Sequence, residues 1–333
     1  MSIQVDLPAT AAEKVKASAE AVKDINKEYG DGAIFDMGDR KGLAVAVVPF
    51  GIYSLDYEAL TVGGLPRGRI VEVYGAEGGG KTSACLRVIA SAQKLGELCA
   101  FIDAEHALDP NWATEKHGVD IDKLLVSQPD SGEQALNIVE RLVSSGAFSV
   151  IVVDSVAALV PQSELNGEFG DASMGVQARM MSQAMRKLTG IVSKTNTILI
   201  FINQVRATIG NSWGPSEATS GGRALKFYAS VRLDVRRMST IKVGDEAVGN
   251  KIKIKVVKNK VAAPFKETEV DLLFDSGFDS LGSLIDPAIK YGLISKGGAW
   301  YTYKGERFQG EKNLKTGLDL ALLTKEVLEA KDK

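Results

Sequence analysis

One glycine-rich segment constrains the fold of this chain more than any other: Gly75-Ala76-Glu77-Gly78-Gly79-Gly80-Lys81-Thr82. It follows an apolar, β-branched run at 70–74 and opens a stretch of helical periodicity from 81 to 93. Glycines between a strand and a helix let successive backbone N–H groups point at phosphate oxygens, and the helix N-terminus adds partial positive charge. We therefore predict a phosphate-binding loop, with candidate ligands Gly75, Glu77, Gly78, Gly79, Gly80, Lys81, Thr82 and Ser83.

Beyond this loop, β-branched runs alternate with helical patterns as far as residue 202. The runs lie at 98–102, 150–153 and 197–202, and the helical patterns at 132–144 and 178–192. Such alternation predicts an α/β fold, a P-loop ATPase core with a mostly parallel twisted sheet flanked by helices. After residue 224, strand-like runs at 231–236, 251–257 and 269–274 predict antiparallel strands added to that sheet.

The two ends of the chain differ from this core. Near the N-terminus, Val15, Ala19, Val22 and Ile25 recur at helical spacing, which predicts an amphipathic helix that packs either on its own domain or on a neighbouring copy. The last residues mix short helices with an aromatic strand at 300–303. We expect an N-terminal helical segment at 1–42, the core at 43–275 and a small α+β domain at 276–333.

Composition adds little about function. The net charge is −2, so any basic surface for a nucleic acid must be local. Cys85 and Cys99 lack metal-ligand spacing and are expected to be buried thiols in a reducing compartment. Neither a signal pattern nor an apolar run of about 18 residues is found, so we expect a cytoplasmic protein without a membrane partner.

A P-loop requires acidic residues at the ends of neighbouring strands. Asp154 closes the run 150–153, and with the Thr82 hydroxyl it is a candidate to hold Mg²⁺ beside ATP, the carboxylate acting through water. The pair Asp154-Ser155 could instead cap a helix. Glu105 is the best candidate to activate the attacking water, with Asp103 and His106 as alternatives that spacing alone does not separate.

Six further blocks resemble bacterial RecA recombinases: FIDAEHALDP at 101–110, VIVVDSVAAL at 150–159, MMSQAMRKL at 180–188, FINQ at 201–204, ALKFYASVRLD at 224–234 and VVKNKVAAPFK at 256–266. The resemblance runs from about Tyr29 to Gly310. It implies an ATP-dependent homologous recombinase that polymerises as a helical filament on single-stranded DNA, partly through segment 1–42, and pairs it with double-stranded DNA. It also implies DNA-stimulated ATP hydrolysis, and a repressor stimulated to cleave itself as a further partner.

The resemblance also implies roles for single residues. The residue matching Glu105 activates water, and the one matching Gln204 senses the γ-phosphate and passes its state to the loop that follows. Trp112, near Asp109, takes the place of the aromatic residue that stacks on adenine, although it could be core filling. Asp154, Ser155 and Pro264 complete the nucleotide site. Lys258 and Lys260 match lysines that reach the ATP of the adjacent protomer, and Phe227 matches an interface residue.

Two segments resemble the DNA-binding loops of the family, at about 164–175 and 205–222. Met174 and Ile209 are apolar candidates to wedge between bases. The candidates for contact with the DNA backbone are Arg179, Ser182, Arg186, Arg206, Gly221, Gly222 and Arg223. The P-loop departs from the common pattern at Ala76 and at Gly78-Gly79. Two alternatives stay open, a helicase or motor on the same fold and a regulatory nucleotide-binding module.

Overall fold

The computed structural model describes residues 10–36, 38, 45–168, 175–207 and 217–331. The chain divides into two compact units, Met1–Ala44 and Val45–Lys333. The first unit holds the predicted N-terminal helix, α1 (Ala11–Tyr29), which begins with a capping box. The Thr10 side chain accepts from the backbone N–H of Glu13, whose carboxylate accepts from the backbone N–H of Thr10. None of the residues of α1 is buried within its own unit.

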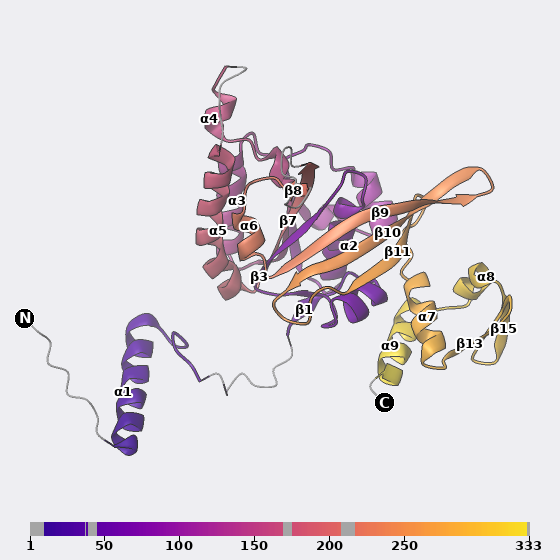
Figure 1. Ribbon diagram of the computed structural model, residues 1–333, viewed down its shortest axis with the longest axis horizontal. Helices are drawn as coiled ribbons and strands as arrows, with labels where there is room; N and C mark the ends of the chain where they lie inside the picture. The colour runs from indigo at the N-terminus through magenta and orange to yellow at the C-terminus, as the bar shows by residue number, and fades with distance from the viewer. Residues whose placement is uncertain (1–9, 37, 39–44, 169–174, 208–216, 332–333) are drawn as a thin grey trace, which may run out of the picture. The chain divides into compact units, whose positions relative to one another are not determined.

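The second unit is built on one large twisted sheet (Figure 1). Its strands in spatial order are β12 (Gly277–Phe278), β11 (Glu267–Leu273), β10 (Glu246–Asn259), β9 (Val231–Val243), β3 (Arg69–Gly75), β7 (Ile198–Ala207), β6 (Phe148–Asp154), β4 (Leu98–Asp103) and β5 (Leu124–Ser127), with β8 (Glu217–Thr219) paired to β7. A separate small pair joins β1 (Val47–Val48) to β2 (Leu65–Pro66).

The register of the sheet brings the candidate site residues to one edge. The strands β9, β3, β7, β6, β4 and β5 are parallel, whereas β10, β11 and β12 are antiparallel additions. The mostly parallel core and the antiparallel strands at 251–257 and 269–274 are confirmed. The prediction for 231–236 is wrong, because this run lies in β9, which pairs in parallel with β3. The chain passes through α6 (Ala224–Tyr228) before β9, and such a helical crossover returns a strand in the parallel direction. Because parallel strands end at the same edge, Gly75 lies opposite Gln204, and Asp103 lies opposite Asp154. Open α/β sheets bind ligands at this edge.

Helices cover both faces of the sheet and enclose two apolar cores. On one face lie α2 (Lys81–Lys94) and the short helix η2 (Ser54–Ala59), and on the other α3 (Gly132–Ser144), α5 (Val176–Thr195) and α6 (Ala224–Tyr228). Figure 1 shows α3, α5 and α6 on one side of β3 and β7, with α2 on the other. Short helices η3 (Trp112–Lys116), η4 (Ile121–Lys123), η5 (Val156–Ala158) and α4 (Gln162–Leu165) lie in the connections.

The C-terminal part has a core of its own, as predicted for the small α+β domain. The hairpins of β13 (Ile294–Gly297), β14 (Trp300–Tyr303) and β15 (Glu306–Gln309) pack with α7 (Gly282–Lys290), α8 (Glu311–Thr316) and α9 (Leu320–Lys331). This core extends to Tyr53, whose backbone N–H donates to Ser283 Oγ at 3.1 Å. Cys85 and Cys99 are buried free thiols. Within the described part of the chain, no helix combines the length and apolar character needed to cross a membrane.

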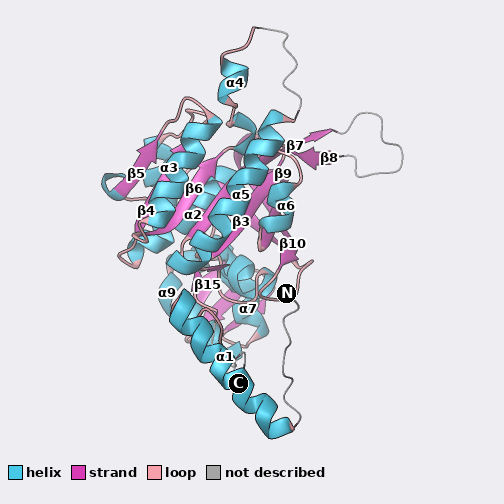
Figure 2. Cartoon of the chain, turned by 90° about the vertical axis from the view of Figure 1, so that its left-hand side faces the viewer, coloured by secondary structure: helices cyan, strands magenta, loops and turns pink. Residues whose placement is uncertain are grey.

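One predicted loop contains regular structure. The sequence suggested that the strand before Gln204 ends at residue 202 and that 205–222 is loop, but β7 continues to Ala207 and pairs with β8 in an antiparallel ladder from Val205↔Thr219 to Ala207↔Glu217. Backbone hydrogen bonds at the base of a loop satisfy polar groups that a buried junction would otherwise leave unpaired. Figure 2 shows α4, which begins near the first predicted DNA loop, at the same end of the core as β7 and β8.

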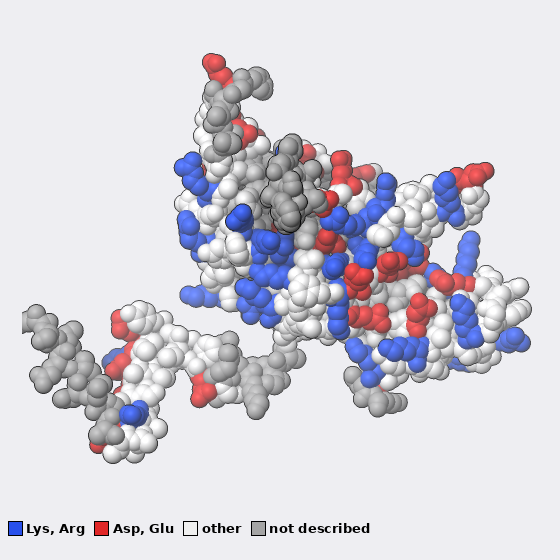
Figure 3. All heavy atoms as spheres, viewed as in Figure 1, with Lys and Arg blue, Asp and Glu red and all other residues white. Residues whose placement is uncertain are grey.

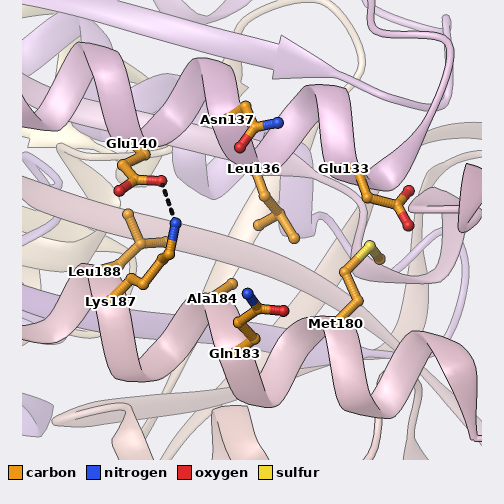
Figure 4. Close-up of a pocket in the computed structure, with 9 residues that line it drawn as sticks. All are labelled: Glu133, Leu136, Asn137, Glu140, Met180, Gln183, Ala184, Lys187 and Leu188. Carbon is orange, nitrogen blue, oxygen red and sulfur yellow. Dashed lines mark hydrogen bonds and ion pairs between the residues drawn. The ribbon is translucent and has the colours of Figure 1, made fainter.

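A groove of about 120 Å³ lies between α3 and α5 (Figure 4). Leu136, Met180 and Leu188 line it, and Lys187 Nζ donates to Glu140 Oε2 at 3.3 Å across it. The groove shares no residue with the phosphate loop. The groove is therefore separate from the residues around the phosphate loop.

Candidate functional site

Two glycines, Gly75 and Gly79, hold the phosphate loop close against the sheet. A Cβ on Gly75 would lie 2.0 Å from the Val235 carbonyl oxygen, and one on Gly79 would lie 2.9 Å from the same atom. Gly80 precedes α2 with a φ of 85°, in the left-handed region. The loop therefore follows β9 closely and turns directly into the N-terminus of α2, the arrangement that the sequence predicted for a phosphate cradle.

Lys81 is the cation of this loop. It is 9% exposed, and its Nζ donates to the Ala76 carbonyl oxygen at 2.7 Å, so the ammonium group lies folded over the loop. Burial lowers the pKa of Lys81, and the carboxylates of Asp154, Glu105 and Glu77 oppose that shift. A buried ammonium with few fixed partners gains strongly from an anionic ligand such as a phosphate oxygen.

Thr82 and Asp154 form the second part of the site. The Thr82 hydroxyl donates to Asp154 Oδ2 at 2.7 Å, which joins α2 to the end of β6. Burial raises the pKa of Asp154 to about 6, while the Thr82 hydrogen bond lowers it. A hydroxyl beside a carboxylate is a hard oxygen donor set that fits Mg²⁺. Among the described residues, no group of three or more His, Cys, Asp or Glu could enclose a metal, so phosphate and water oxygens would have to complete the ligands.

Glu105 lies beside this pair, and its contacts separate it from Asp103, one of the two alternative bases. His106, the other alternative, is exposed like Glu105. Glu105 Oε1 accepts from Gln204 Nε2 at 3.0 Å and also from the Ser155 hydroxyl. The exposed carboxylate is therefore at the site, yet remains open to solvent. Asp103, by contrast, is 1% exposed and accepts from the backbone of Ala107 and Leu108 and from Gln128. A carboxylate so enclosed is an organiser of the turn rather than a base for a bound substrate.

The hydroxyl of Ser155 shows whether the Asp154-Ser155 pair acts as a helix cap or belongs to the site. Ser155 precedes η5 without a side-chain capping bond, because its hydroxyl is directed to Glu105. The backbone N–H groups of Ala104 and Glu105 donate to the Asp154 carbonyl oxygen at 2.8 and 3.2 Å. The ends of β4 and β6 are thus joined, which fixes the carboxylates of Glu105 and Asp154 relative to each other.

Trp112, the candidate for stacking on adenine, contacts α2, the helix that follows the phosphate loop. Its Nε1 donates to Ser83 Oγ at 3.3 Å, and Asp109 accepts from the backbone N–H of Trp112, which positions the start of η3. The indole also packs against the core and meets the His117 ring at 5.4 Å between centroids. Its half-buried face is therefore compatible with both readings of the sequence, base stacking and core filling. Pro264 is half-buried in the segment after β10, and the described contacts do not join it to the phosphate loop.

Lys258 lies away from the phosphate loop, at the end of β10. Its Nζ donates at 2.9 Å to the carbonyl oxygens of Lys226 and Phe227, at the end of α6. Burial, followed by the charges of Lys260 and Arg232, lowers the pKa of Lys258. The Phe227 side chain is 67% exposed, and Lys260 is also exposed. Lys258, Lys260 and Phe227 thus form one surface of the chain, separate from its own nucleotide-site candidates.

The candidate DNA contacts gather around α5 and α6. Arg179, Arg186, Arg206 and Arg223 are exposed. Figure 3 shows Lys and Arg side chains over α5 and α6 with few Asp or Glu among them. This is a local basic surface, as a nucleic-acid-binding protein with a net charge of −2 requires. The Ser182 hydroxyl donates to the Ala178 carbonyl oxygen at 2.8 Å. Met174 and Ile209 lie outside the described residues.

Gly221 and Gly222 are tight packing points at the end of the second loop. A Cβ on Gly221 would lie 2.6 Å from Val156 Cγ1, and one on Gly222 would lie 2.7 Å from the Ala178 Cβ. Both residues have φ in the left-handed region, 78° and 79°. The loop therefore returns to the core in direct contact with η5, next to Asp154 and Ser155, and with α5.

Sequence reasoning missed a buried polar network behind the site. Glu72 in β3 is fully buried and pairs with Arg232 in β9, while Asn203 Nδ2 donates to Glu72 Oε1 at 3.0 Å. The signal was present, since each of the three interrupts an otherwise apolar, β-branched run. A polar residue in a central strand must find partners within the sheet.

Comparisons with known proteins agree with this geometry. The family model of the RecA N-terminal domain matches residues 16–279, and that of the RecA C-terminal domain matches residues 282–331. Protein RecA of Chloroherpeton thalassium is 55% identical over 323 residues, 96% of this chain and 90% of the relative. Protein RecA of Leifsonia xyli is 56% identical over 303 residues, 91% of this chain and 84% of the relative.

A solved structure agrees with the fold. The RadB recombinase matches with a TM-score of 0.54 and 20% identity, over 70% of this chain and 98% of that one, which bears on the fold alone. The two family models together cover nearly the whole length of the chain beyond residue 15. The chain belongs to the RecA family, whose members are DNA-dependent ATPases that act in homologous recombination.

Proposed function

We propose that this chain forms a filament on single-stranded DNA with ATP, pairs that strand with homologous duplex and releases it after hydrolysis. One observation carries the proposal: the phosphate loop, Asp154, Glu105 and Gln204 meet at one edge of the sheet, and Gln204 stands at the base of the second DNA loop. A nucleotide and a polynucleotide strand would thus contact the same short segment of β7.

The nucleotide is assigned to residues around the phosphate loop. Backbone N–H groups of 75–83 and the Lys81 ammonium would hold the phosphates, with Trp112, Asp109 and Pro264 on the base side. Thr82 and Asp154 are the proposed Mg²⁺ ligands, the carboxylate acting through water. Bound there, the metal ion would neutralise charge that develops on the phosphate oxygens.

Hydrolysis requires a base near the γ-phosphate, and we assign it to Glu105. Its carboxylate would take a proton from the water whose oxygen attacks the γ-phosphorus, and the bond to the β-phosphate oxygen breaks to leave ADP and phosphate. Gln204 donates to the same carboxylate at 3.0 Å. A γ-phosphate offers its amide a competing acceptor, so the position of Gln204 would report which nucleotide is bound.

The DNA strand is assigned to the basic surface around α5 and α6. Arg179, Arg186, Arg206 and Arg223 would neutralise phosphates, which holds a strand without reading its sequence. Ser182 and the backbone of Gly221 and Gly222 are further contacts to the DNA backbone. Met174 and Ile209 stay predictions as apolar wedges between bases.

Protomers are proposed to meet through the surface of Phe227, Lys258 and Lys260, whose lysines would reach the ATP of the next copy. A large exposed aromatic ring is typical of an interface residue. We further propose that segment 1–42 takes part in polymerisation, that 43–275 and 276–333 act as core and accessory domains, and that the filament works in the cytoplasm, where it stimulates a repressor to cleave itself. The helicase and regulatory alternatives are not favoured, because both RecA family models match.

The first test replaces Lys81. In Lys81→Ala, ATP turnover in the presence of single-stranded DNA should fall by about 100-fold or more, since a preorganised cation at the phosphates is lost. Lys94→Ala, at the exposed far end of the same helix, is the matched control and should keep its turnover. Unchanged turnover in Lys81→Ala would remove the phosphate-loop assignment.

The second measurement is strand exchange itself. The chain is incubated with single-stranded DNA and homologous duplex in the presence of ATP, ADP or a non-hydrolysable ATP analogue, and joint molecules are scored together with filaments by electron microscopy. We expect filaments with ATP and with the analogue, and joint molecules that require a triphosphate. Filaments that form equally with ADP would contradict the proposal.

A further inference from the structure

Asn203 occupies a central place in β7 that none of the roles above uses. The side chain is fully buried. Its Nδ2 donates to Glu72 Oε1 and to the Ser220 carbonyl oxygen, each at 3.0 Å, and its Oδ1 accepts from the Gln204 backbone N–H at 2.9 Å. Both donor positions and one acceptor position of the amide are therefore used.

Glu72 determines which way this amide faces. It is fully buried, and its second oxygen, Oε2, accepts from Arg232 Nε. The Arg232 guanidinium lies over the Tyr74 ring, 4.5 Å from its centroid. Because a carboxylate can only accept, the Asn203 amide must present its nitrogen to Glu72, and its oxygen is then left for Gln204. The buried ion pair of Glu72 and Arg232 therefore fixes the orientation of the Asn203 amide, and we do not count it as a contribution to the stability of the fold.

The amide of Asn203 thereby ties together the two ends of the second DNA loop. Gln204 begins the segment that leaves the sheet, and Ser220 is where the chain returns after β8. Their backbones also meet directly, because the Ser220 N–H donates to the Gln204 carbonyl oxygen at 3.3 Å. Next to Ser220, Gly221 packs on Val156. A displacement of the Gln204 backbone therefore reaches Ser220 by two routes, the Asn203 side chain and this backbone hydrogen bond.

We infer that Asn203 is a positioning residue that couples Gln204 to the second DNA loop, so that the nucleotide bound at the phosphate loop changes the affinity for DNA. The inference rests on the proposed function, in which Gln204 senses the γ-phosphate and the loop holds the strand. The measurable quantity is the coupling ratio, defined as the affinity for single-stranded DNA with a non-hydrolysable ATP analogue divided by the affinity with ADP.

Asn203→Asp is the primary variant, because it keeps the shape and the acceptor for Gln204 but removes both donors. It also places a second carboxylate next to Glu72. We expect the coupling ratio to fall by about 10-fold or more, within the usual range of such couplings, together with a lower melting temperature. Thr197→Val is the matched control: it removes the buried hydrogen bond from Thr197 Oγ1 to the Phe148 carbonyl oxygen at the opposite end of β7. It should lower the melting temperature and leave the ratio unchanged.

The double variant Asn203→Asp with Glu72→Gln separates positioning from stability. It restores a donor and an acceptor between positions 72 and 203 and keeps a single carboxylate near Arg232, yet Ser220 still lacks its side-chain donor. We expect the melting temperature to recover while the coupling ratio stays low. This variant carries the test if Asn203→Asp alone does not fold.

The outcomes are distinguishable. Equal DNA affinity with the analogue and with ADP in the unmodified chain means that the proposed function fails. A coupling ratio that is present in the unmodified chain and is retained in Asn203→Asp overturns the inference about Asn203. Recovery of the ratio in the double variant also overturns it, because the contact to Ser220 would then be unnecessary.

Discussion

At the scale of single residues, His117 is a buried imidazole whose two ring nitrogens have no hydrogen-bonding partner in the described part of the chain. Its ring lies between Trp112, at 5.4 Å, and Phe278 in β12, at 6.2 Å. Burial, followed by the charge of Arg87, lowers the pKa of His117 from 6.5 to about 4. The residue therefore acts as a neutral aromatic spacer behind the base-side candidate Trp112.

The shifted pKa of His117 gives stability a pH dependence. Between about pH 6.5 and about pH 4 the unfolded chain binds a proton at this residue and the folded chain does not, so stability is lost as the pH falls through that window. We expect the free energy of unfolding, measured with urea, to fall when the pH is lowered from about 7.5 to about 5.5. The fall should be roughly 1 kcal/mol larger in the unmodified chain than in His117→Leu. Equal losses in the two proteins would contradict the assignment.

The shifted pKa of Asp56 changes stability with pH in the opposite direction to that of His117. Asp56 is present in both the unmodified chain and His117→Leu. Burial raises its pKa to about 7, against hydrogen bonds from the backbone N–H groups of Phe50, Gly51 and Ile52. Its folded form therefore holds a proton in a range where the unfolded form has lost it, which favours folding as the pH falls below about 7. Comparing two variants that both keep Asp56 isolates the contribution of His117.

At the scale of elements, the second DNA loop is defined by its base. Antiparallel pairing of β7 with β8, the Asn203 amide and the contact of Gly221 with Val156 hold its two ends at the carboxyl edge of the sheet. These contacts place the start of the loop next to Glu105 through Gln204. The loop therefore joins a rigid element at the nucleotide site, which is where a nucleotide-dependent change can be passed on.

Gly221→Ala tests that packing. The new Cβ would meet Val156 Cγ1 at 2.6 Å, whereas at Gly244, in the turn between β9 and β10, a Cβ meets nothing within 4 Å. Both glycines have positive φ, 78° and 63°, so both alanine variants carry a backbone cost. We expect Gly221→Ala to lose about 1–3 kcal/mol more stability than Gly244→Ala and to bind single-stranded DNA more weakly. Equal denaturation midpoints and DNA affinities would show that the contact is unimportant.

At the scale of the whole molecule, the surface of Phe227, Lys258 and Lys260 is the candidate contact between protomers. In the single chain, Lys258 binds the carbonyl oxygens at the end of α6, beside the exposed ring of Phe227. Reaching a neighbouring nucleotide requires Lys258 to leave those carbonyl oxygens. A triphosphate offers the ammonium a full negative charge in their place, which is a stronger partner than two peptide dipoles.

Lys258→Ala should therefore reduce DNA-stimulated ATP hydrolysis and shorten filaments, while nucleotide binding by the free chain is unchanged. The expected loss of stimulated turnover is about 100-fold, because a charge at the transferring phosphate is removed. Lys325→Ala, in α9 and paired with Glu329 at 3.8 Å, is the control. Light scattering on single-stranded DNA, with electron microscopy, measures assembly, and full stimulation in Lys258→Ala would count against the role across protomers.

Local patterns were enough to predict much of the fold and the membership of the site. The helical pattern at 132–144 has the bounds of α3, and the glycine loop lies between β3 and α2, as expected. Thr82, Asp154 and Glu105 were named from motif and position, and Gln204 from the family resemblance. Thr82 contacts Asp154, and Glu105 contacts both Gln204 and the Asp154 backbone, although their roles stay predictions. Spacing left Glu105, Asp103 and His106 open, because it does not record which of these side chains the turn after β4 directs to the ligand.

The sequence by itself determined the order of strands and helices and the phosphate loop, because periodicity and glycine conformation are local properties of the chain. Only the tertiary structure decided which polar residues became partners. Glu72, Asn203 and Arg232 come from three different strands and meet through the parallel register of β3, β7 and β9. Their pairing depends on which strands become neighbours and on burial that leaves no water to satisfy them, neither of which a local sequence pattern records.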